Sequence, residues 1–379
     1  MRDSQKKKVL TAGHICLDLA PSFYDNGTRH IEELLQPGKT LEVGAADLHT
    51  GGSVANTGLA MKIFGNDVKL LAKVGNDAFG EIVRGILKKY QADEYVISSE
   101  NDSTAYTAVL APPGIDRIFL HHQGANATFS SGDVRDDLLK EADLFHFGYP
   151  TAMAAMYAND GKELIDLMQR AHEAGAMTSL DLCGIDPNSA SGRSDWRGIL
   201  EATLPYVDFF LPSIEELCYI LDRRRFASWK EKAQGGDVTE VISAKEEAAL
   251  LADQCLSMGT AVAVIKCGLP GIYCKTAGKE RMAKIFDKKQ SESWSNREIF
   301  ESSYLAEKFL SGTGAGDASI AAFHTALLEG EDLEMALHMA AAAGAACVTA
   351  YDAISGLPSY DELKKKVADG WKKIDSCVG

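Results

Sequence analysis

Residues 311–328 read SGTGAGDASIAAFHTALL, a glycine-rich turn that runs directly into an apolar helical segment. Because Gly312, Gly314 and Gly316 carry no side chain, the backbone of this turn is bare. The first amides of a helix have no partner within the helix and carry partial positive charge. Such a turn predicts a binding site for phosphate at the start of the helix. Asp317 falls in the first helical turn, where a base could take the proton of an attacking hydroxyl.

The spacing of these glycines differs from two common nucleotide-binding motifs. No Gly-Lys-Ser/Thr follows, so the turn is not a Walker A loop. Position 317 is Asp where a dinucleotide fingerprint needs a third glycine or alanine, which argues against a hydride-transfer enzyme. The alternative interpretation is structural, since a glycine-rich cap followed by an acidic residue stabilises a helix by about 1 kcal/mol.

Short apolar runs rich in β-forming residues alternate with helical patterns along most of the chain. The alternation predicts an α/β fold with a doubly wound, mostly parallel sheet flanked by helices. Ligands bind such sheets at the carboxyl ends of the strands. The expected strands are residues 9–12, 68–74, 144–147, 178–182, 207–211 and 261–266. The expected helices are residues 53–64, 79–90, 161–174, 214–221, 244–258, 314–328, 333–349 and 360–374.

Two stretches break the alternation. Residues 19–50 contain no convincing helix, and residues 104–123 show two extended runs around a Pro-Pro-Gly turn. We expect them to pair as a small antiparallel sheet that forms a lid, although ordinary surface hairpins are the alternative. The lid carries the apolar residues of a possible homodimer contact, which are Val109, Leu110, Ile118 and Leu120. The lid also carries His121 and His122, which as strand neighbours point to opposite faces and so argue against a metal pair.

The whole chain, residues 1–379, is expected to form one domain. Residues 222–239 and 287–301 are polar, lack clear periodicity and are interpreted as insertions. The net charge of −15 argues against a nucleic-acid partner, because such proteins normally carry basic surfaces. The 8 cysteines include no C-x-x-C pair, and neither a signal segment nor a transmembrane run is evident, so we expect a cytoplasmic protein with reduced thiols.

A second glycine motif and one acidic residue indicate hydroxyl recognition. Gly51 and Gly52 precede a Ser-capped helix whose first turn presents Asn56. Bare backbone beside an amide side chain suits a polyol, although a plain helix cap at Ser53 explains the motif as well. Asp18 ends the first strand region, where a carboxylate can accept hydrogen bonds from hydroxyl groups.

Together these segments resemble the ribokinase-like, PfkB-type carbohydrate kinases over nearly the whole chain. Residues 51–65 (GGSVANTGLAMKIFG) with 73–80 (KVGNDAFG) resemble the first family signature, and residues 312–323 (GTGAGDASIAAF) resemble the second. The resemblance implies phosphoryl transfer from ATP, with Mg²⁺, to a hydroxyl of a small sugar or sugar derivative. It also implies a doubly wound sheet with a β-lid.

The resemblance further implies roles for individual residues. Asp317 corresponds to the general base, and Gly314, Ala315 and Gly316 to the anion hole. The acceptor positions correspond to Asp18, Gly51, Gly52 and Asn56. The nucleotide and phosphate positions correspond to Ser213, Glu216, Lys266, Gly268, Gly271 and Thr313. Glu216 would in addition organise Mg²⁺ through water.

This sequence departs from the family pattern at three places. Ser213 stands where the family commonly has Asn, and Ser311 where it often has an Asp tied to a monovalent-cation site. The stretch 287–301 is longer than usual beside the adenine side. The acceptor stays open between a sugar and a nucleoside, whose base could stack on Phe23, Tyr24, Tyr106 or Phe119. A non-catalytic sensor is a further alternative, although a sensor has no use for a base at Asp317.

Overall fold

A nine-stranded sheet forms the centre of the molecule in this computed structural model, which describes residues 6–25, 27, 30–115 and 117–374. Its strand order is β13-β12-β11-β10-β9-β8-β1-β4-β5. In this order, all neighbouring strands from β11 through β10, β9, β8, β1 and β4 to β5 pair in parallel. The strands β12 and β13 pair antiparallel at the edge beyond β11. The bounds are β1 Lys8–Gly13, β4 Asp67–Gly75, β5 Val96–Ser99, β8 Leu144–Gly148, β9 Met177–Asp181, β10 Phe209–Phe210, β11 Val262–Lys266, β12 Gly271–Thr276 and β13 Glu298–Ser302.

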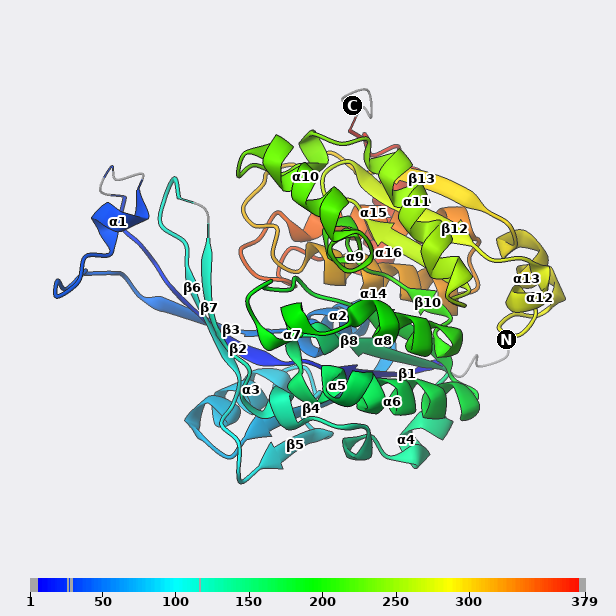
Figure 1. Cartoon of the computed structure of the whole chain (residues 1–379), viewed down its shortest axis with the longest axis horizontal. Coiled ribbons are helices and arrows are strands. Elements are labelled where there is room, and N and C mark those ends of the chain that lie inside the picture. Colours follow the sequence, from blue (N-terminus) through cyan, green and yellow to red (C-terminus); the bar gives the residue numbers. More distant parts are fainter. Residues whose placement is uncertain (1–5, 26, 28–29, 116, 375–379) are drawn as a thin grey trace.

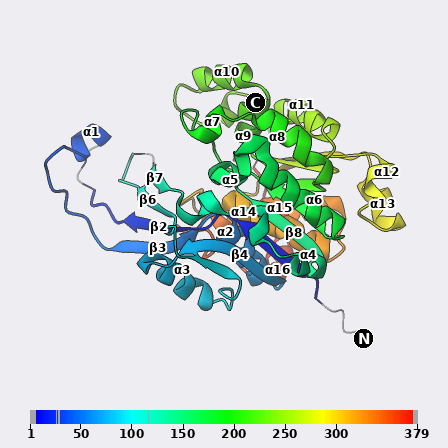
Figure 2. The ribbon, with the colours of Figure 1, turned by 60° about the horizontal axis from the view of Figure 1, so that its bottom comes forward.

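Helices cover both faces of this sheet, as Figures 1 and 2 show. Alternate side chains of a strand enter opposite cores, so Val9 packs in one hydrophobic cluster and Leu10 in the other. The first core includes α2 Ser53–Ile63, α3 Ala78–Lys88, α12 Lys279–Met282, α13 Lys288–Trp294, α14 Ala315–Leu328, α15 Leu333–Cys347 and α16 Tyr360–Ala368. The second includes α4 Asp136–Glu141, α5 Ala154–Tyr157, α6 Lys162–Glu173, α8 Trp196–Thr203, α9 Ile214–Leu221, α10 Arg223–Ala233 and α11 Ala244–Ser257.

A second, four-stranded sheet projects from the carboxyl ends of the central strands (Figure 1). Its order is β3-β2-β6-β7, with bounds Ala46–Gly51, Cys16–Pro21, Tyr106–Leu110 and Ile118–His122. The pairs β2–β3 and β6–β7 are antiparallel, as expected, whereas the central pair β2–β6 is parallel. The parallel pair forms because β2 and β6 both run outward from the large sheet.

Short elements complete the chain. They are α1 Ile31–Leu34 and α7 Ala190–Arg193, with 3-10 turns at Gly124–Thr128, Ser131–Asp133, Pro150–Ala152, Asn159–Gly161, Leu204–Tyr206 and Val238–Glu240. Helix α1 lies within the stretch for which no helix was expected, and it is one turn long. Within the described residues, no helix combines the length and the apolar character needed to cross a membrane.

The two polar stretches are better ordered than their sequence indicates. The first contains α10, whose Trp229 is 2% exposed and packs in the core beside α9. The second contains α13, with Trp294 fully buried, and leads into β13 at the sheet edge. In both helices an N-cap Asp, Asp222 or Asp287, accepts a hydrogen bond from a first-turn amide. One buried tryptophan packs each helix against the core. A single buried residue produces no periodic apolar pattern, so the sequence did not indicate these helices.

Candidate active site

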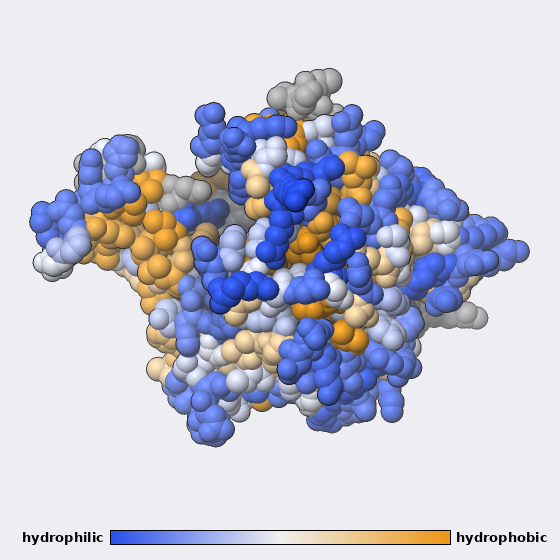
Figure 3. Space-filling view, in the orientation of Figure 1, coloured by the Kyte–Doolittle hydropathy of each residue, from blue (hydrophilic) through white to orange (hydrophobic). Residues whose placement is uncertain are grey.

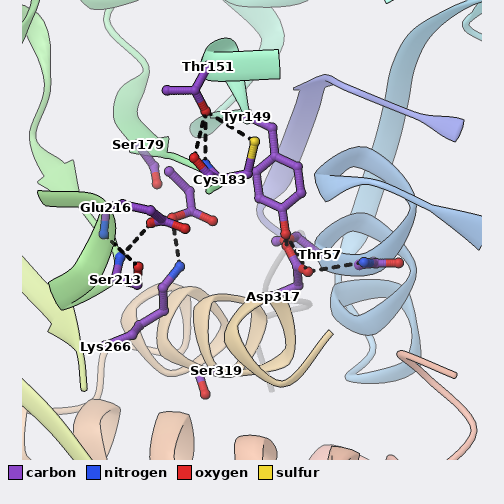
Figure 4. A network of polar contacts seen from close by, with 12 residues as sticks. Thr57, Tyr149, Thr151, Ser179, Cys183, Ser213, Glu216, Lys266, Asp317 and Ser319 are labelled. Atoms are coloured by element: carbon purple, nitrogen blue, oxygen red, sulfur yellow. Dashed lines mark hydrogen bonds and ion pairs between the residues drawn. The ribbon is translucent and has the colours of Figure 1, made fainter. Parts of the chain in front are cut away.

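Asp317 lies in the first turn of α14 and is only 2% exposed. Asn56 Nδ2 donates to Asp317 Oδ2 at 3.0 Å, and Thr57 Oγ1 donates to Oδ1 at 3.2 Å. The hydroxyl of Tyr149 donates to both oxygens, at 2.9 and 2.8 Å (Figure 4). Three segments that are far apart in the sequence therefore converge on one carboxylate.

Close backbone contacts place these three segments. Gly314 caps α14 in the left-handed region, with φ of 76°, and a Cβ there would lie 2.2 Å from the Cβ of Ala353. At the ends of β1 and β8, a Cβ on Gly13 would lie 2.3 Å from the oxygen of Gly148. A Cβ on Gly148 would in turn overlap the side chain of Ser53 at the start of α2. These contacts hold the end of β8 against α2, opposite Asp317.

Positive charge gathers around the glycine-rich turn. Lys266, at the end of β11, brings its Nζ to 3.5 Å from the point that a Cβ on Gly316 would occupy. Arg117, from the β6–β7 hairpin, donates to Ser311 Oγ at 2.9 Å and to Thr313 Oγ1 at 2.5 Å. Lysine, arginine and the first amides of α14 form a set of donors that suits phosphate oxygens.

Lys266 forms a buried ion pair with Asp181, at 2.7 Å, where β9 ends. Burial raises the pKa of Asp181 to about 8, although Lys266 acts in the opposite direction. Burial opposes the charge on Lys266, but the carboxylates of Asp181 and Glu216 outweigh it and raise the pKa of the ammonium group. Asp181 Oδ2 is buried without a hydrogen-bond partner within the described structure. Asp181 Oδ2 is therefore an acceptor that a ligand or water can use.

Glu216 and Ser213 lie at the start of α9, beside this ion pair (Figure 4). They form a capping box, in which Ser213 N donates to Glu216 Oε2 at 2.8 Å and Glu216 N donates to Ser213 Oγ at 3.2 Å. The neighbouring Glu215 instead pairs with Lys230 at 2.9 Å. One carboxylate oxygen of Glu216 is thus engaged in the cap, while its charge still acts on Asp181 and Lys266.

Asp18 lies on the small sheet, on the same face as its cross-strand partners Thr107 and His49. Cys16 Sγ donates to Asp18 Oδ1 at 3.3 Å, and burial raises the pKa of the Asp18 carboxyl. A Cβ on Gly51 would lie 2.2 Å from Asp18 Oδ2, so a bare residue is needed there.

A histidine pair closes this side of the site. His14 Nε2 lies 3.3 Å from His121 Nε2, and the His14 ring lies 6.1 Å from the ring of Tyr149. Burial, with a smaller effect of His121, lowers the pKa of His14 to about 3, so its ring is neutral. A Cβ on Gly52 would lie 2.5 Å from His14 Nδ1, which is buried without a partner in the described structure. Here too the bare glycine makes room for a neighbouring side chain.

With this geometry in place, the comparisons with known proteins decide the family. The sequence profile described as pfkB family carbohydrate kinase matches residues 6–360. The chain belongs to this family. The 5-dehydro-2-deoxygluconokinase of Listeria monocytogenes is 22% identical over 368 residues, which cover 96% of this kinase and 97% of the relative. The predicted family and the predicted carbohydrate kinase activity are confirmed.

Solved structures show the same fold. The Arabidopsis thaliana ribokinase complexed with ribose and ATP has a TM-score of 0.68 at 20% identity, covering 95% of this chain and 98% of that one. The putative ribokinase II of Escherichia coli in complex with ATP and Mg²⁺ has a TM-score of 0.68 at 19% identity, covering 96% and 99%. The ribokinase-like fold predicted for this kinase is therefore confirmed.

Most residues predicted from the sequence fall into three groups in this kinase. Asn56 and the turn that includes Thr313, Gly314, Ala315 and Gly316 surround Asp317, next to Lys266. Asp18 and Gly51 meet on the small sheet. Gly268 and Gly271 form the turn after β11, with Gly271 N donating to Gly268 O at 3.2 Å. Their individual roles stay predictions.

Four residues of the site were missed: Thr57, Tyr149, Asp181 and Arg117. Thr57 lies inside the quoted glycine motif, and Asp181 lies in an expected strand near its carboxyl end, the criterion that selected Asp18. Tyr149 follows an expected strand by two residues and precedes a proline. Arg117 had no sequence signal, because its importance comes from the folding of a hairpin onto a turn almost 200 residues away.

The donor set fits a nucleotide phosphate better than a metal ion held by protein alone. Within the described residues, no group of three His, Cys, Asp or Glu side chains could hold a metal. Asp181 and Glu216 are carboxylates beside the phosphate donors, and carboxylates suit Mg²⁺ through water. A Mg²⁺ ion held near them through water would reduce the negative charge of the phosphates.

Proposed function

We propose that this kinase transfers the γ-phosphoryl group of ATP to a hydroxyl of a small sugar or sugar derivative, with Asp317 as general base. The observation that carries the proposal is the position of Asp317. Its carboxylate lies in the same helical turn whose first amides, with the neighbouring Lys266, form the proposed phosphate site. The base and the anion site therefore face a common space, as in-line transfer requires.

The steps assigned to the chain are mainly positioning and charge. The amides of Gly314, Ala315 and Gly316, with Lys266, would stabilise the negative charge of the transferring phosphoryl group. Arg117 adds a cation from the small sheet to the same turn. Contact between the hairpin and the turn would also exclude water, which makes the small sheet a lid in this proposal.

Acceptor recognition is assigned to the face of the small sheet that carries Asp18. Its neighbours there are Thr107, His49 and His121, all of them polar groups that suit hydroxyls. The relative from Listeria is named for a keto-deoxy sugar acid, which makes this class the first candidate beside pentoses and hexoses. The histidines and Arg117 could meet the carboxylate of such an acid.

A nucleoside acceptor is the second candidate, and one observation favours it. Phe119 pairs with Val109 across the hairpin and shares a face with His121, and its ring is 53% exposed. A base could stack on this ring. Tyr106 is less suitable, because it lies on the opposite face and packs edge-on against Phe79.

The test is a screen of ADP release from MgATP with pentoses, hexoses, keto-deoxy sugar acids and nucleosides. We expect one sugar class to give the highest kcat/KM, and Asp317→Asn to lower the rate with that class by about 10²–10⁴-fold. A preference for nucleosides would select the second candidate. No acceptor-dependent ADP release with any class would contradict the proposed function.

The small sheet is also the proposed site of homodimer formation. Its second face carries Leu48, Tyr106 and Leu120, which are 41%, 37% and 56% exposed. Leu110 and Ile118 share that face, whereas Val109 points to the acceptor side. Figure 3 shows apolar residues gathered over the projecting part of the molecule, where a second copy would cover them.

A further inference from the structure

Tyr149 holds an unusual position directly after β8. Its backbone adopts the left-handed region, with φ of 66° and ψ of 40°, between Gly148 and Pro150. A non-glycine residue in that region costs about 1 kcal/mol or more, so its surroundings must favour the conformation. The backbone amide of Tyr149 donates to the backbone carbonyl oxygen of Asp181 at 3.1 Å. The conformation aims the ring across the site, with its hydroxyl between the two oxygens of Asp317 (Figure 4).

Three donated hydrogens point at the carboxylate of Asp317, from Asn56, Thr57 and Tyr149. A carboxylate offers roughly four lone-pair positions. Asn56 uses one, Thr57 uses a second, and Tyr149 contacts both oxygens. A base must accept the hydrogen of the acceptor hydroxyl. The Tyr149 hydroxyl lies between both oxygens and approaches from a different side than the α2 donors, so an acceptor hydroxyl that comes in on that side has to displace it.

Tyr149 is the donor that can give way. Asn56 and Thr57 are buried and project from consecutive positions of helix α2. Tyr149 comes from the loop after β8, is partly exposed and carries its hydroxyl at the end of a long side chain. Burial, reinforced by the Asp317 and Asp181 carboxylates, raises the pKa of Tyr149, so the phenol stays protonated. It therefore presents to Asp317 the same group as an acceptor does, a neutral hydroxyl.

We propose that the Tyr149 hydroxyl holds the place of the acceptor hydroxyl on Asp317 and keeps water away from this base until an acceptor displaces it. The inference rests on the proposed function and adds a guard against ATP hydrolysis. In that side reaction a water oxygen bonds to the γ-phosphorus, the bond from phosphorus to the ADP oxygen breaks, and the water proton passes to Asp317. The products are ADP and inorganic phosphate.

The test measures inorganic phosphate released from MgATP in the absence of any acceptor. Tyr149→Phe keeps the ring and removes only the hydroxyl, so water can reach Asp317. We expect phosphate release to rise by roughly fivefold or more, because the net contribution of one ordinary hydrogen bond corresponds to about this factor in an equilibrium or rate. The double variant Tyr149→Phe/Asp317→Asn should return to the low rate, since the water then lacks its base.

Tyr219→Phe is the matched control. The buried Tyr219 hydroxyl donates to the backbone carbonyl oxygen of Gly192 at 3.1 Å. The control variant therefore also loses one tyrosine hydrogen bond, but outside the candidate site. Its phosphate release should equal that of the wild type. Melting temperatures of all variants show whether folding is intact. A merely structural Tyr149 would lower the melting temperature and leave phosphate release unchanged.

A second measurement does not depend on turnover. Binding of an acceptor should move Tyr149 and change the ultraviolet absorbance of tyrosine in the wild type, and the change should be lost in Tyr149→Phe. The probes are D-ribose, D-fructose and a keto-deoxy sugar acid. Equal phosphate release by Tyr149→Phe and wild type, with normal acceptor phosphorylation, would overturn the proposed role of Tyr149 in preventing ATP hydrolysis and leave the proposed function standing. No ATP turnover by either protein under any condition would overturn the guard and the proposed function together.

Discussion

Replacing Asp317 by Asn tests the proposed base most directly, because the change keeps shape and removes charge. The carboxylate accepts from Asn56 at one oxygen, from Thr57 at the other, and from Tyr149 at both. An amide has one acceptor oxygen and one NH₂ donor. The oxygen should face the Nδ2 donor of Asn56, and the NH₂ should face Thr57, whose hydroxyl can turn and accept. Half of the Tyr149 contact is lost.

The structure therefore predicts two effects of very different size. The loss of roughly one hydrogen bond should cost about 1 kcal/mol of stability. The loss of the base should lower kcat by about 10²–10⁴-fold, equivalent to about 3–5 kcal/mol of transition-state stabilisation. ATP affinity should change little, since the amides of α14 and Lys266 are untouched.

The assay compares kcat by coupled ADP release, ATP binding by calorimetry and the melting temperature. Asp77→Asn is the control, because Asp77 also lies at the start of a helix, as the N-cap of α3, and accepts from Gly80 N and Thr104 N, both at 2.8 Å. It should lose comparable stability and keep its kcat within a few-fold. If Asp317→Asn turns over as fast as Asp77→Asn, the reasoning that makes Asp317 the base is wrong.

Four further predictions follow from the same structure. Asp18→Ala should raise the KM for the acceptor far more than the KM for ATP, and equal changes would count against acceptor binding by Asp18. Arg117→Ala should raise the KM for ATP by roughly tenfold, because a charge-assisted contact to the phosphate turn is lost, and Arg117→Lys should restore only part of it. His146 is buried against Ser179, and burial lowers its pKa to about 3. The unfolded state then takes up the proton first, so the stability that this neutral histidine supports is present above pH 6.5 and is lost as the pH falls towards 3, at about 1.4 kcal/mol per pH unit. Urea unfolding of His146→Asn across this range should show a shallower loss than the wild type. Leu120→Glu should shift a wild-type dimer to monomer in sedimentation experiments, and a wild type that is already monomeric would dismiss the proposed interface.

Much of the fold could be predicted because local patterns and global packing agree. The expected strand at residues 68–74 and the helices at 53–64 and 314–328 match β4, α2 and α14 within one or two residues. The helix expected at 360–374 ends at Ala368, because Gly370 adopts a positive φ of 85° that stops it. Three strands of the central sheet were not predicted: the short parallel edge strand β5, and β12 and β13, which as antiparallel edge strands interrupt the alternation.

The candidate site was predictable only in part. A glycine-rich turn pointed to Asp317 and a strand end to Asp18, and the family resemblance added Lys266. Asp317 and Lys266 lie beside the groups that such chemistry needs. Tyr149 and Arg117 have no such local mark. Each acts across a gap in the sequence, through a left-handed backbone in one case and a folded hairpin in the other.

The distance along the chain between Asn56 and Asp317, 261 residues, has a consequence for synthesis in the cell. The donors Asn56, Thr57 and Tyr149 are made long before the residue that they hold. A nascent or truncated chain that lacks α14 would carry these donors without the base, and so could not turn over nucleotide by the proposed route. Activity by this route would then begin only after α14 has been synthesised and has docked against α2.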